Sequence, residues 1–169
     1  MIDQSWQIRH TSSSDRAVFS ASGKQTVSEG RTSNARVGGR PLRILLAEDN
    51  PADVFLFRLA LTEYAVPTEL TVAKDGTSVL EILGGHDFDI LILDLNLPGV
   101  GGEEILWKLT AASETDKPAI PVVVFSAVRV MPRDAPGAHA CVVKPEGLDE
   151  YLKAVRRICD TWLSPTGLV

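Results

Sequence analysis

From Leu42 onward, short runs of apolar residues alternate with longer stretches that mix apolar and polar positions. This alternation is typical of parallel strands joined by crossover helices, and a nearly all-apolar run suits a strand covered on both faces. The apolar runs predict five strands, at 42–47, 68–73, 89–93, 121–125 and 141–143. The mixed stretches predict helices at 51–64, 75–83, 103–112 and 148–163. The sequence therefore predicts a doubly wound α/β domain built on a five-stranded parallel sheet.

One interval lacks the helix that this alternation requires. Between the fourth and fifth predicted strands, residues 128–138 contain Pro132, Pro136 and Gly137. Two prolines four residues apart disrupt a helix interior, because each removes a backbone donor and clashes with the preceding turn. We expect a loop or a single 3₁₀ turn there, so that the fourth helix is shortened or absent.

The first 41 residues differ in texture from the rest of the chain. Eight of the first 40 are serine, and the segment shows neither helical nor strand periodicity. Such composition is typical of a flexible arm. We expect an N-terminal arm at 1–41, a single domain at 42–163 and a short tail at 164–169. Two interpretations of this arm remain open: it has no functional consequence, or it docks on a partner.

Charge and cysteine content limit the kinds of partner and site that we expect for this protein. The arm has six Lys and Arg against three Asp and Glu, whereas the whole chain has a net charge of −5, so the domain itself is acidic. An acidic domain disfavours nucleic acid as a partner, since phosphate contacts need clustered Lys and Arg. Cys141 and Cys159 form no metal-binding spacing, and no stretch approaches the roughly 20 apolar residues of a membrane span. We expect a cytoplasmic protein with no membrane segment.

Polar residues stand at the carboxyl ends of four predicted strands, the edge where open parallel α/β sheets bind ligands. They are Glu48 and Asp49, then Asp94, Ser126 and Lys144. Taken singly, each has a structural explanation: carboxylates favour a helix N-terminus, a loop hydroxyl bonds its own backbone, and a lysine at a strand end is solvated. Their joint occurrence at one edge favours a functional site.

The acidic members of this set suit a magnesium ion. Mg²⁺ prefers octahedral oxygen coordination and keeps several waters. The carboxylates of Asp49 and Asp94 and the backbone carbonyl of Asn96 are the expected direct ligands. Glu48, longer by one methylene, is expected to reach the ion through a water.

The remaining members suit transfer of a phosphoryl group to Asp94. The ion and Lys144 neutralise the repulsion between a carboxylate nucleophile and an anionic donor, and transfer leaves an aspartyl phosphate. Ser126 can donate its hydroxyl to a phosphoryl oxygen, and the small Ala127 leaves room for the group. Asp94 directly follows a strongly apolar strand, where an unpaired charge is costly, so a purely structural role is hard to assign to it.

Four short motifs resemble those of bacterial response-regulator receiver domains. They are LLAEDN at 45–50, LDLNLP at 93–98, VFSA at 124–127 and VVKP at 142–145. The resemblance covers 42–163 and implies a flavodoxin-like, CheY-like fold with strand order 2-1-3-4-5. It also implies that Asp94 is the phosphoacceptor, Ser126 the hydroxyl switch and Lys144 the family's lysine.

By this resemblance the chain is a response regulator of a two-component phosphorelay, a phosphoacceptor and not an enzyme with its own substrate. Its donor is then a phosphohistidine on a sensor histidine kinase or a phosphotransfer protein. LDLNLP, together with Trp162, Leu163 and Leu168, resembles single-domain regulators that partner bacterial phytochromes and often dimerise through a C-terminal extension. Because only six residues follow Leu163, we expect the signal to pass by protein contacts or by a homodimer through the C-terminal helix.

Two departures from the receiver pattern concern the read-out. The position three residues before the lysine, usually Tyr or Phe, is Cys141, and the proline-rich interval 128–138 replaces most of the fourth helix. They favour an alternative, a constitutive receiver-like scaffold without a working phospho-switch. A hydrolase that uses Asp94 as nucleophile is disfavoured, because dehalogenase-like phosphatases need a second Asp where this chain has Asn96. Apolar Val128, two residues after Ser126, is expected to hinder hydrolytic water.

Overall fold

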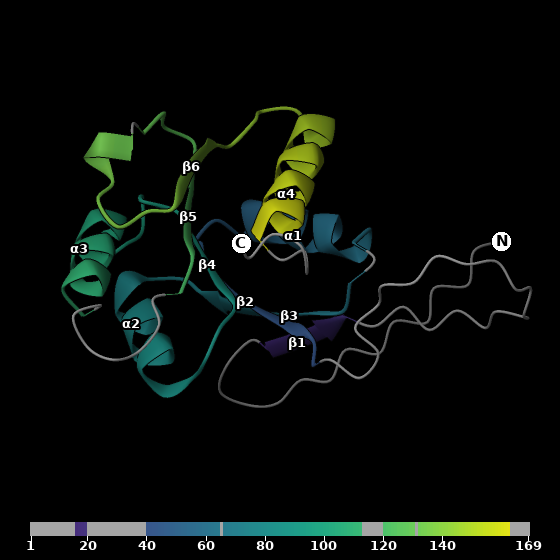
Figure 1. Cartoon of the computed structure of the whole chain (residues 1–169). Helices are drawn as coiled ribbons and strands as arrows, with labels where there is room; N and C mark the ends of the chain where they lie inside the picture. Colours follow the sequence, from purple (N-terminus) through teal and green to yellow (C-terminus); the bar gives the residue numbers. More distant parts are fainter. Residues whose placement is uncertain (1–15, 20–39, 65, 113–119, 131, 163–169) are drawn as a thin grey trace, which may run out of the picture.

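The structure, a computed structural model, describes residues 16–19, 40–64, 66–112, 120–130 and 132–162. Its sheet has the strand order β1-β3-β2-β4-β5-β6 (Figure 1). The strands are β1 (Arg16–Phe19), β2 (Leu42–Ala47), β3 (Thr68–Ala73), β4 (Ile90–Leu93), β5 (Val122–Ser126) and β6 (Ala140–Val143). Strands β2 to β6 are parallel, and their order is the predicted 2-1-3-4-5 when they are counted from β2. The predicted doubly wound five-stranded parallel sheet is confirmed.

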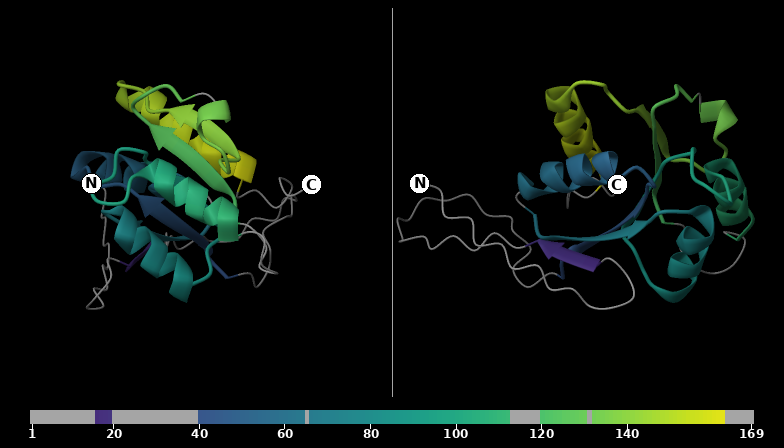
Figure 2. Two further views of the ribbon diagram at one scale, coloured as in Figure 1. Left: turned by 90° about the vertical axis from the view of Figure 1, so that its left-hand side faces the viewer. Right: turned by 180° about the vertical axis from the view of Figure 1, so that it is seen from behind.

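Four helices cover the two faces of this sheet. They are α1 (Pro51–Thr62), α2 (Gly76–Gly85), α3 (Gly102–Ala112) and α4 (Leu148–Trp162). Helices α1 and α4 pack together on one face, and α2 and α3 lie on the other (Figure 2). Two buried clusters result, one centred on Phe57 and Phe125 beneath α1 and α4, the other on Ile105 and Leu106 beneath α3. All four residues of β4 are buried, as expected for a central strand covered on both faces.

Local signals place the first two helices as predicted. Asn50 caps α1, where its side chain accepts a hydrogen bond from the backbone N–H of Ala52 at 3.0 Å, and Pro51 occupies the first turn. Asp75 caps α2 by accepting from the backbone N–H of Ser78 at 2.8 Å. Because each cap sits at the carboxyl end of a strand, both helices begin at the edge of the sheet where the polar residues gather.

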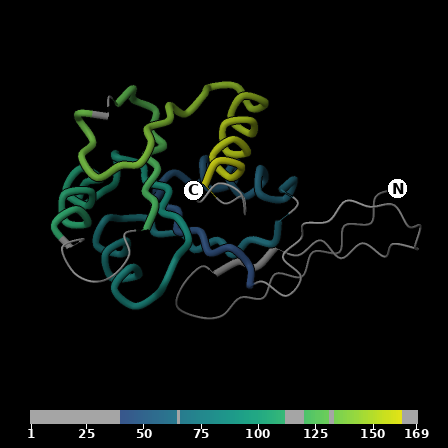
Figure 3. The backbone as a smooth tube through the Cα atoms, in the orientation of Figure 1, coloured from purple at the N-terminus to yellow at the C-terminus, as the bar shows by residue number. Residues whose placement is uncertain are grey.

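The interval between β5 and β6 contains a 3₁₀ turn at Pro132–Asp134 in place of a full helix. The tube in Figure 3 shows that this segment lacks the regular coil of α2 and α3. The shortened fourth helix predicted from Pro132 and Pro136 is confirmed. Within the described residues, no helix is both long enough and apolar enough to cross a membrane.

The strand β1 was not predicted, because we expected no strand in the first 41 residues. It pairs antiparallel with β3 at the edge of the sheet, from Arg16 opposite Thr71 to Phe19 opposite Thr68. Four residues are too few for an alternating pattern to be recognised, and pairing with an open sheet edge supplies backbone hydrogen bonds that no periodicity signals. The rest of the predicted arm and the predicted tail 164–169 lie outside the described residues.

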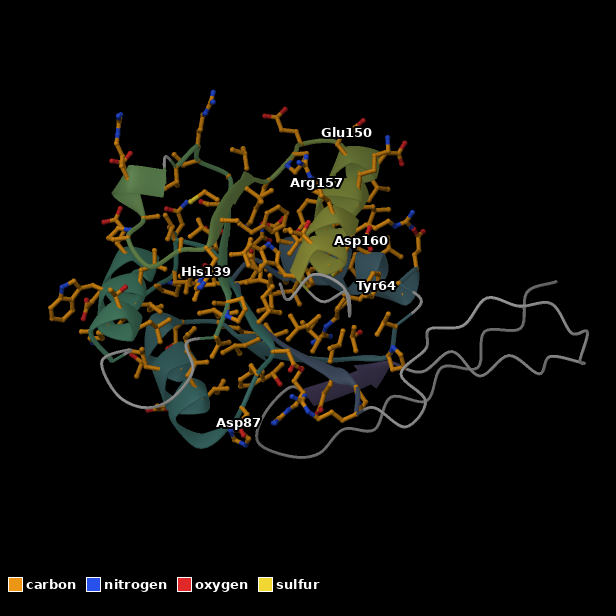
Figure 4. All side chains as sticks on the ribbon, in the orientation of Figure 1. Tyr64, Asp87, His139, Glu150, Arg157 and Asp160 are labelled. Atoms are coloured by element: carbon orange, nitrogen blue, oxygen red, sulfur yellow. The ribbon has the colours of Figure 1, made fainter. Side chains whose placement is uncertain are left out.

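Helix α4 buries one apolar side and presents charge on the other. Tyr151, Val155, Ile158 and Cys159 are buried in the core beneath it. Figure 4 shows Glu150, Arg157 and Asp160 on this helix, all exposed to solvent. Trp162 is half-buried and meets the ring of His139 edge-on, with ring centroids 5.9 Å apart. Packing within the domain therefore accounts for the buried apolar positions of the last helix, whereas Leu148 at its start is 50% exposed.

Candidate functional site

The predicted site residues are brought together by backbone hydrogen bonds that extend the sheet beyond its strands. The N–H of Asp94 donates to Ala47 at 3.0 Å, and the N–H of Lys144 donates to Ser126 at 2.9 Å. Since β2, β4, β5 and β6 are neighbours in the sheet, these bonds fix the residues that follow the strands at one edge. The structure thus places Glu48, Asp94, Ser126 and Lys144 at the predicted carboxyl edge.

Lys144 lies at the centre of this edge. Its side chain is only 7% exposed, and its amine donates to Glu48 Oε2 and to Asp94 Oδ2, each at 2.5 Å. Burial by itself lowers the pKa of Lys144, but hydrogen bonds to the surrounding carboxylates outweigh burial and raise the pKa above its usual 10.5. Burial raises the pKa of Glu48, and this effect exceeds the lowering caused by its bond to Lys144. The lysine is therefore held as a buried cation against two carboxylates from different strand ends.

A third carboxylate joins this group, and sequence reasoning missed it. Asp53, in the first turn of α1, accepts a hydrogen bond from the Lys144 amine at 2.9 Å. The hydroxyl of Tyr151 in α4 donates to the backbone carbonyl of Asp53 at 3.2 Å. An aspartate in a first helical turn usually serves the helix dipole, so the sequence alone carries no signal that distinguishes Asp53.

Asp94 is 6% exposed, and both of its carboxylate oxygens are engaged. Oδ2 bonds Lys144, and Oδ1 accepts from the backbone N–H of Asn96 at 3.0 Å. The loop after Asp94 is also held from α3, because the first residue of that helix, Gly102, approaches it closely. A Cβ at Gly102 would lie 2.6 Å from the Cα of Leu95, which only glycine allows. The carboxylate of Asp94 is therefore tightly oriented.

Ser126 ends β5 with its hydroxyl buried. The residue is 1% exposed, and its Oγ has no hydrogen-bond partner among the described residues. A buried unpaired hydroxyl costs free energy, and such atoms often mark a place where a ligand supplies the partner. Ala127 is exposed next to it, and Val128, also predicted to matter, is 61% exposed.

Cys141, at the position where receivers usually have an aromatic ring, is half-buried. It packs against the cluster beneath α2 and α3, and burial raises the pKa of its thiol. An aromatic row lies instead beneath the other face, where Phe125 meets Tyr151 edge-on at 5.2 Å between centroids and Phe57 at 6.5 Å. The ring next to the hydroxyl of Ser126 in the chain is thus Phe125, which belongs to the α1 and α4 side.

The residues at this edge fit a magnesium ion. In the described chain, no three His, Cys, Asp or Glu side chains are grouped as a ready-made metal cage. Mg²⁺ does not need one, because it keeps several waters and commonly takes one or two carboxylates. Asp94 and Glu48 offer buried carboxylate oxygens, and Asp49, which follows Glu48 in the loop after β2, is exposed. The structure records no contact between Asp49 and the other predicted ligands.

Comparison with known proteins identifies the family of this chain. The family model of the response regulator receiver domain matches residues 44–156. The regulatory protein VirG of Agrobacterium tumefaciens is 31% identical over 130 residues, which are 73% of this chain and 46% of VirG. The chain thus spans about half the length of this relative, or less for others such as a Vibrio sensor kinase.

Solved structures with the same fold include three phytochrome-related or metal-bound regulators. The phosphorylated cyanobacterial phytochrome response regulator RcpA has a TM-score of 0.65 and 29% identity, over 74% of this chain and 96% of that one. The Mn²⁺-bound form of response regulator Rcp1 has a TM-score of 0.65 and 26% identity, over 75% and 97%. The bacteriophytochrome response regulator AtBRR has a TM-score of 0.54 and 34% identity, over 70% and 92%. The chain belongs to the response regulator receiver domain family.

Proposed function

We propose that this chain is a response regulator that accepts a phosphoryl group on Asp94, with Mg²⁺ bound beside it. The observation that carries the proposal is the buried amine of Lys144, held between Asp94 and Glu48 at the end of the sheet. A buried cation against a buried carboxylate is the arrangement that an anionic donor requires, since it offsets the repulsion between donor and nucleophile. The unpaired hydroxyl of Ser126 at the same edge supports it.

The protein residues have separate tasks in this proposal. Asp94 is the nucleophile, Lys144 binds a phosphoryl oxygen, and Ser126 donates to another. Asp49, Asp94 and the backbone carbonyl of Asn96 hold the ion, with Glu48 reaching it through a water. Bound Mg²⁺ supplies positive charge that offsets the negative charge of the phosphoryl group. Asp94 is already oriented by Asn96 and Lys144, so little rearrangement of the nucleophile is needed.

The donor in this proposal is a phosphohistidine on a sensor histidine kinase or phosphotransfer protein in the cytoplasm. RcpA and AtBRR are named as phytochrome and bacteriophytochrome response regulators, and their similarity supports a bacterial phytochrome as the kinase. A homodimer through the C-terminal helix is part of the same proposal, but the charged outer face of α4 means that it needs contacts other than an apolar helix face.

The alternative function is a constitutive scaffold, and one observation favours it. Cys141 is too small to act as the ring that usually follows the hydroxyl residue inward, and it packs on the side of the sheet away from α4. A scaffold of this kind could still bind Mg²⁺, so metal binding does not distinguish the two functions. They are distinguished by whether the chain accepts a phosphoryl group and whether its conformation or oligomeric state then changes.

The test is incubation with Mg²⁺ and acetyl phosphate, followed by intact mass and size-exclusion chromatography. Asp94→Asn is the test variant and Asp87→Asn the control, because Asp87 is exposed and precedes β4, so that it belongs to the opposite edge of the sheet (Figure 4). A single added phosphoryl mass in wild type and Asp87→Asn, lost in Asp94→Asn, supports phosphoryl acceptance. A concurrent change in elution places the output in oligomerisation. No adduct in wild type refutes the proposal in favour of the scaffold.

A further inference from the structure

Three carboxylates contact the amine of Lys144 in the described part of the chain, and one of them has no task in the proposed chemistry. Glu48 and Asp94 are the buried pair to which the proposed function assigns the ion and the phosphoryl group. Asp53 is the third, 2.9 Å from the amine, with its side chain 21% exposed. Asp53 lies in the first turn of α1 and not at the end of a strand, so it contacts Lys144 from the side of the sheet that α1 and α4 cover.

The backbone of Asp53 is fixed from two sides. Asn50 caps the helix three residues earlier, and Tyr151 donates from α4 to the carbonyl of Asp53 at 3.2 Å. The ring of Tyr151 is itself packed edge-on against Phe125. The carboxylate of Asp53 is thus presented to Lys144 by a rigid part of the α1 and α4 layer and not by a mobile loop.

We propose that Asp53 is a positioning residue, which keeps the amine of Lys144 in place when the ion and the phosphoryl group take up the carboxylate oxygens of Glu48 and Asp94. This inference rests on the proposed function. A lysine amine has three donors, and here all three go to carboxylates. Mg²⁺ and the phosphoryl group compete with Lys144 for Glu48 and Asp94. Asp53 has no part in binding the ion or the phosphoryl group in the proposed function, so its bond to Lys144 is the one that persists through the reaction.

The first consequence concerns the affinity for Mg²⁺ in the absence of any donor. Without Asp53, the amine of Lys144 binds Glu48 and Asp94 more strongly and competes better with the ion for them. We expect Asp53→Asn to weaken Mg²⁺ binding by about fivefold, the difference between a charged and a neutral hydrogen bond. In a Lys144→Gln background the same substitution should have a much smaller effect, since no competitor is left. Isothermal titration with MgCl₂ measures all four proteins.

The matched control is Asp149→Asn, which also removes one carboxylate from the first turn of a helix. Asp149 is exposed at the start of α4. If general electrostatic attraction to the ion explains the result, Asp53→Asn and Asp149→Asn should weaken Mg²⁺ binding alike, and the effect of Asp53→Asn should persist without Lys144. Either finding overturns the proposal. If Lys144→Gln does not fold, the comparison of the two aspartate variants with Lys144 in place still decides.

The second consequence concerns the rate of phosphoryl acceptance at saturating Mg²⁺. We expect Asp53→Asn to slow labelling by acetyl phosphate about fivefold and Asp53→Glu, which retains the charge, to restore part of the rate. Equal rates in wild type and Asp53→Asn overturn the positioning role. If wild type takes no phosphoryl group, the proposed function fails, while the Mg²⁺ titrations still decide whether Asp53 controls Lys144.

Discussion

The hydroxyl of Ser126 leads to predictions of opposite sign for two states of the protein. Without phosphate, its Oγ is buried and has no partner among the described residues, and leaving such a group unpaired costs about 1–3 kcal/mol. Replacing Ser126 by Ala removes that cost and loses only the packing of one small oxygen atom. We therefore expect Ser126→Ala to raise the free energy of unfolding of the unphosphorylated protein by about 1 kcal/mol.

With a phosphoryl group on Asp94, the same hydroxyl gains a charged acceptor. A hydrogen bond to a charged group contributes about 1.5–3 kcal/mol. Ser126→Ala should therefore weaken binding of beryllofluoride, a stable mimic of the phosphoryl group, by about this amount. Without the mimic, the variant is expected to be more stable than wild type. When the mimic is added, the variant is expected to gain less stability than wild type gains.

Urea unfolding of wild type and Ser126→Ala, with Mg²⁺ and with or without beryllofluoride, tests both predicted changes in the free energy of unfolding. Ser78→Ala is the control, because the Oγ of Ser78 donates to Asp75 Oδ2 at 2.7 Å and its loss should destabilise the protein in both conditions. A Ser126→Ala protein that is less stable than wild type without the mimic refutes the reasoning. It shows that the hydroxyl is already satisfied in the unphosphorylated state.

Three further predictions follow from the same site. Gly102→Ala should lower the free energy of unfolding by about 1–3 kcal/mol, because its Cβ meets the backbone of Leu95, whereas Gly101→Ala has open space and should not; thermal unfolding compares them. Burial lowers the pKa of Lys144, but its carboxylate partners outweigh burial and raise the pKa above 10.5, so its stabilisation is fully present below about pH 10.5 and falls progressively as the pH rises from there through the higher pKa of the folded state. Urea unfolding between about pH 9 and 12 should show a flat region followed by the onset of this loss, and a Lys144→Gln protein with the same loss contradicts it. Val128→Asn should shorten the lifetime of the aspartyl phosphate by removing an apolar side chain from the path of water, and an unchanged half-life by intact mass removes support.

The strands and helices of the domain could be predicted because the pattern and the capping signals agree. The apolar run of β4 is buried throughout, and Asn50 with Pro51 begins α1 where the sequence places it. The edge position of Asp94 and Lys144 follows from the same pattern, because all parallel strands deliver their carboxyl ends to one side. Predicting the shared edge of Asp94 and Lys144 therefore required only the correct order of strands and helices.

Two features could not be predicted, for different physical reasons. The strand β1 depends on the open edge of β3, which is a property of the folded sheet and leaves no mark on four residues of sequence. The contact of Asp53 with Lys144 joins residues 91 positions apart, and it depends on how the first turn of α1 packs beside the residue that follows β6. An aspartate at that place has a sufficient local explanation in the helix dipole, so tertiary contact was not needed to account for it.

The site and the departures from the receiver pattern occupy different parts of the fold. Among the described residues, the carboxylates that contact the Lys144 amine come from the ends of β2 and β4 and from α1, and none comes from the 3₁₀ turn at Pro132–Asp134. Cys141 packs beneath α2 and α3, whereas the row formed by Phe57, Phe125 and Tyr151 leads from the end of β5 to α1 and α4. The short 3₁₀ turn in place of a fourth helix therefore leaves the contacts of the Lys144 amine in place. The packed connection from Phe125, next to Ser126, to Tyr151 in α4 also remains.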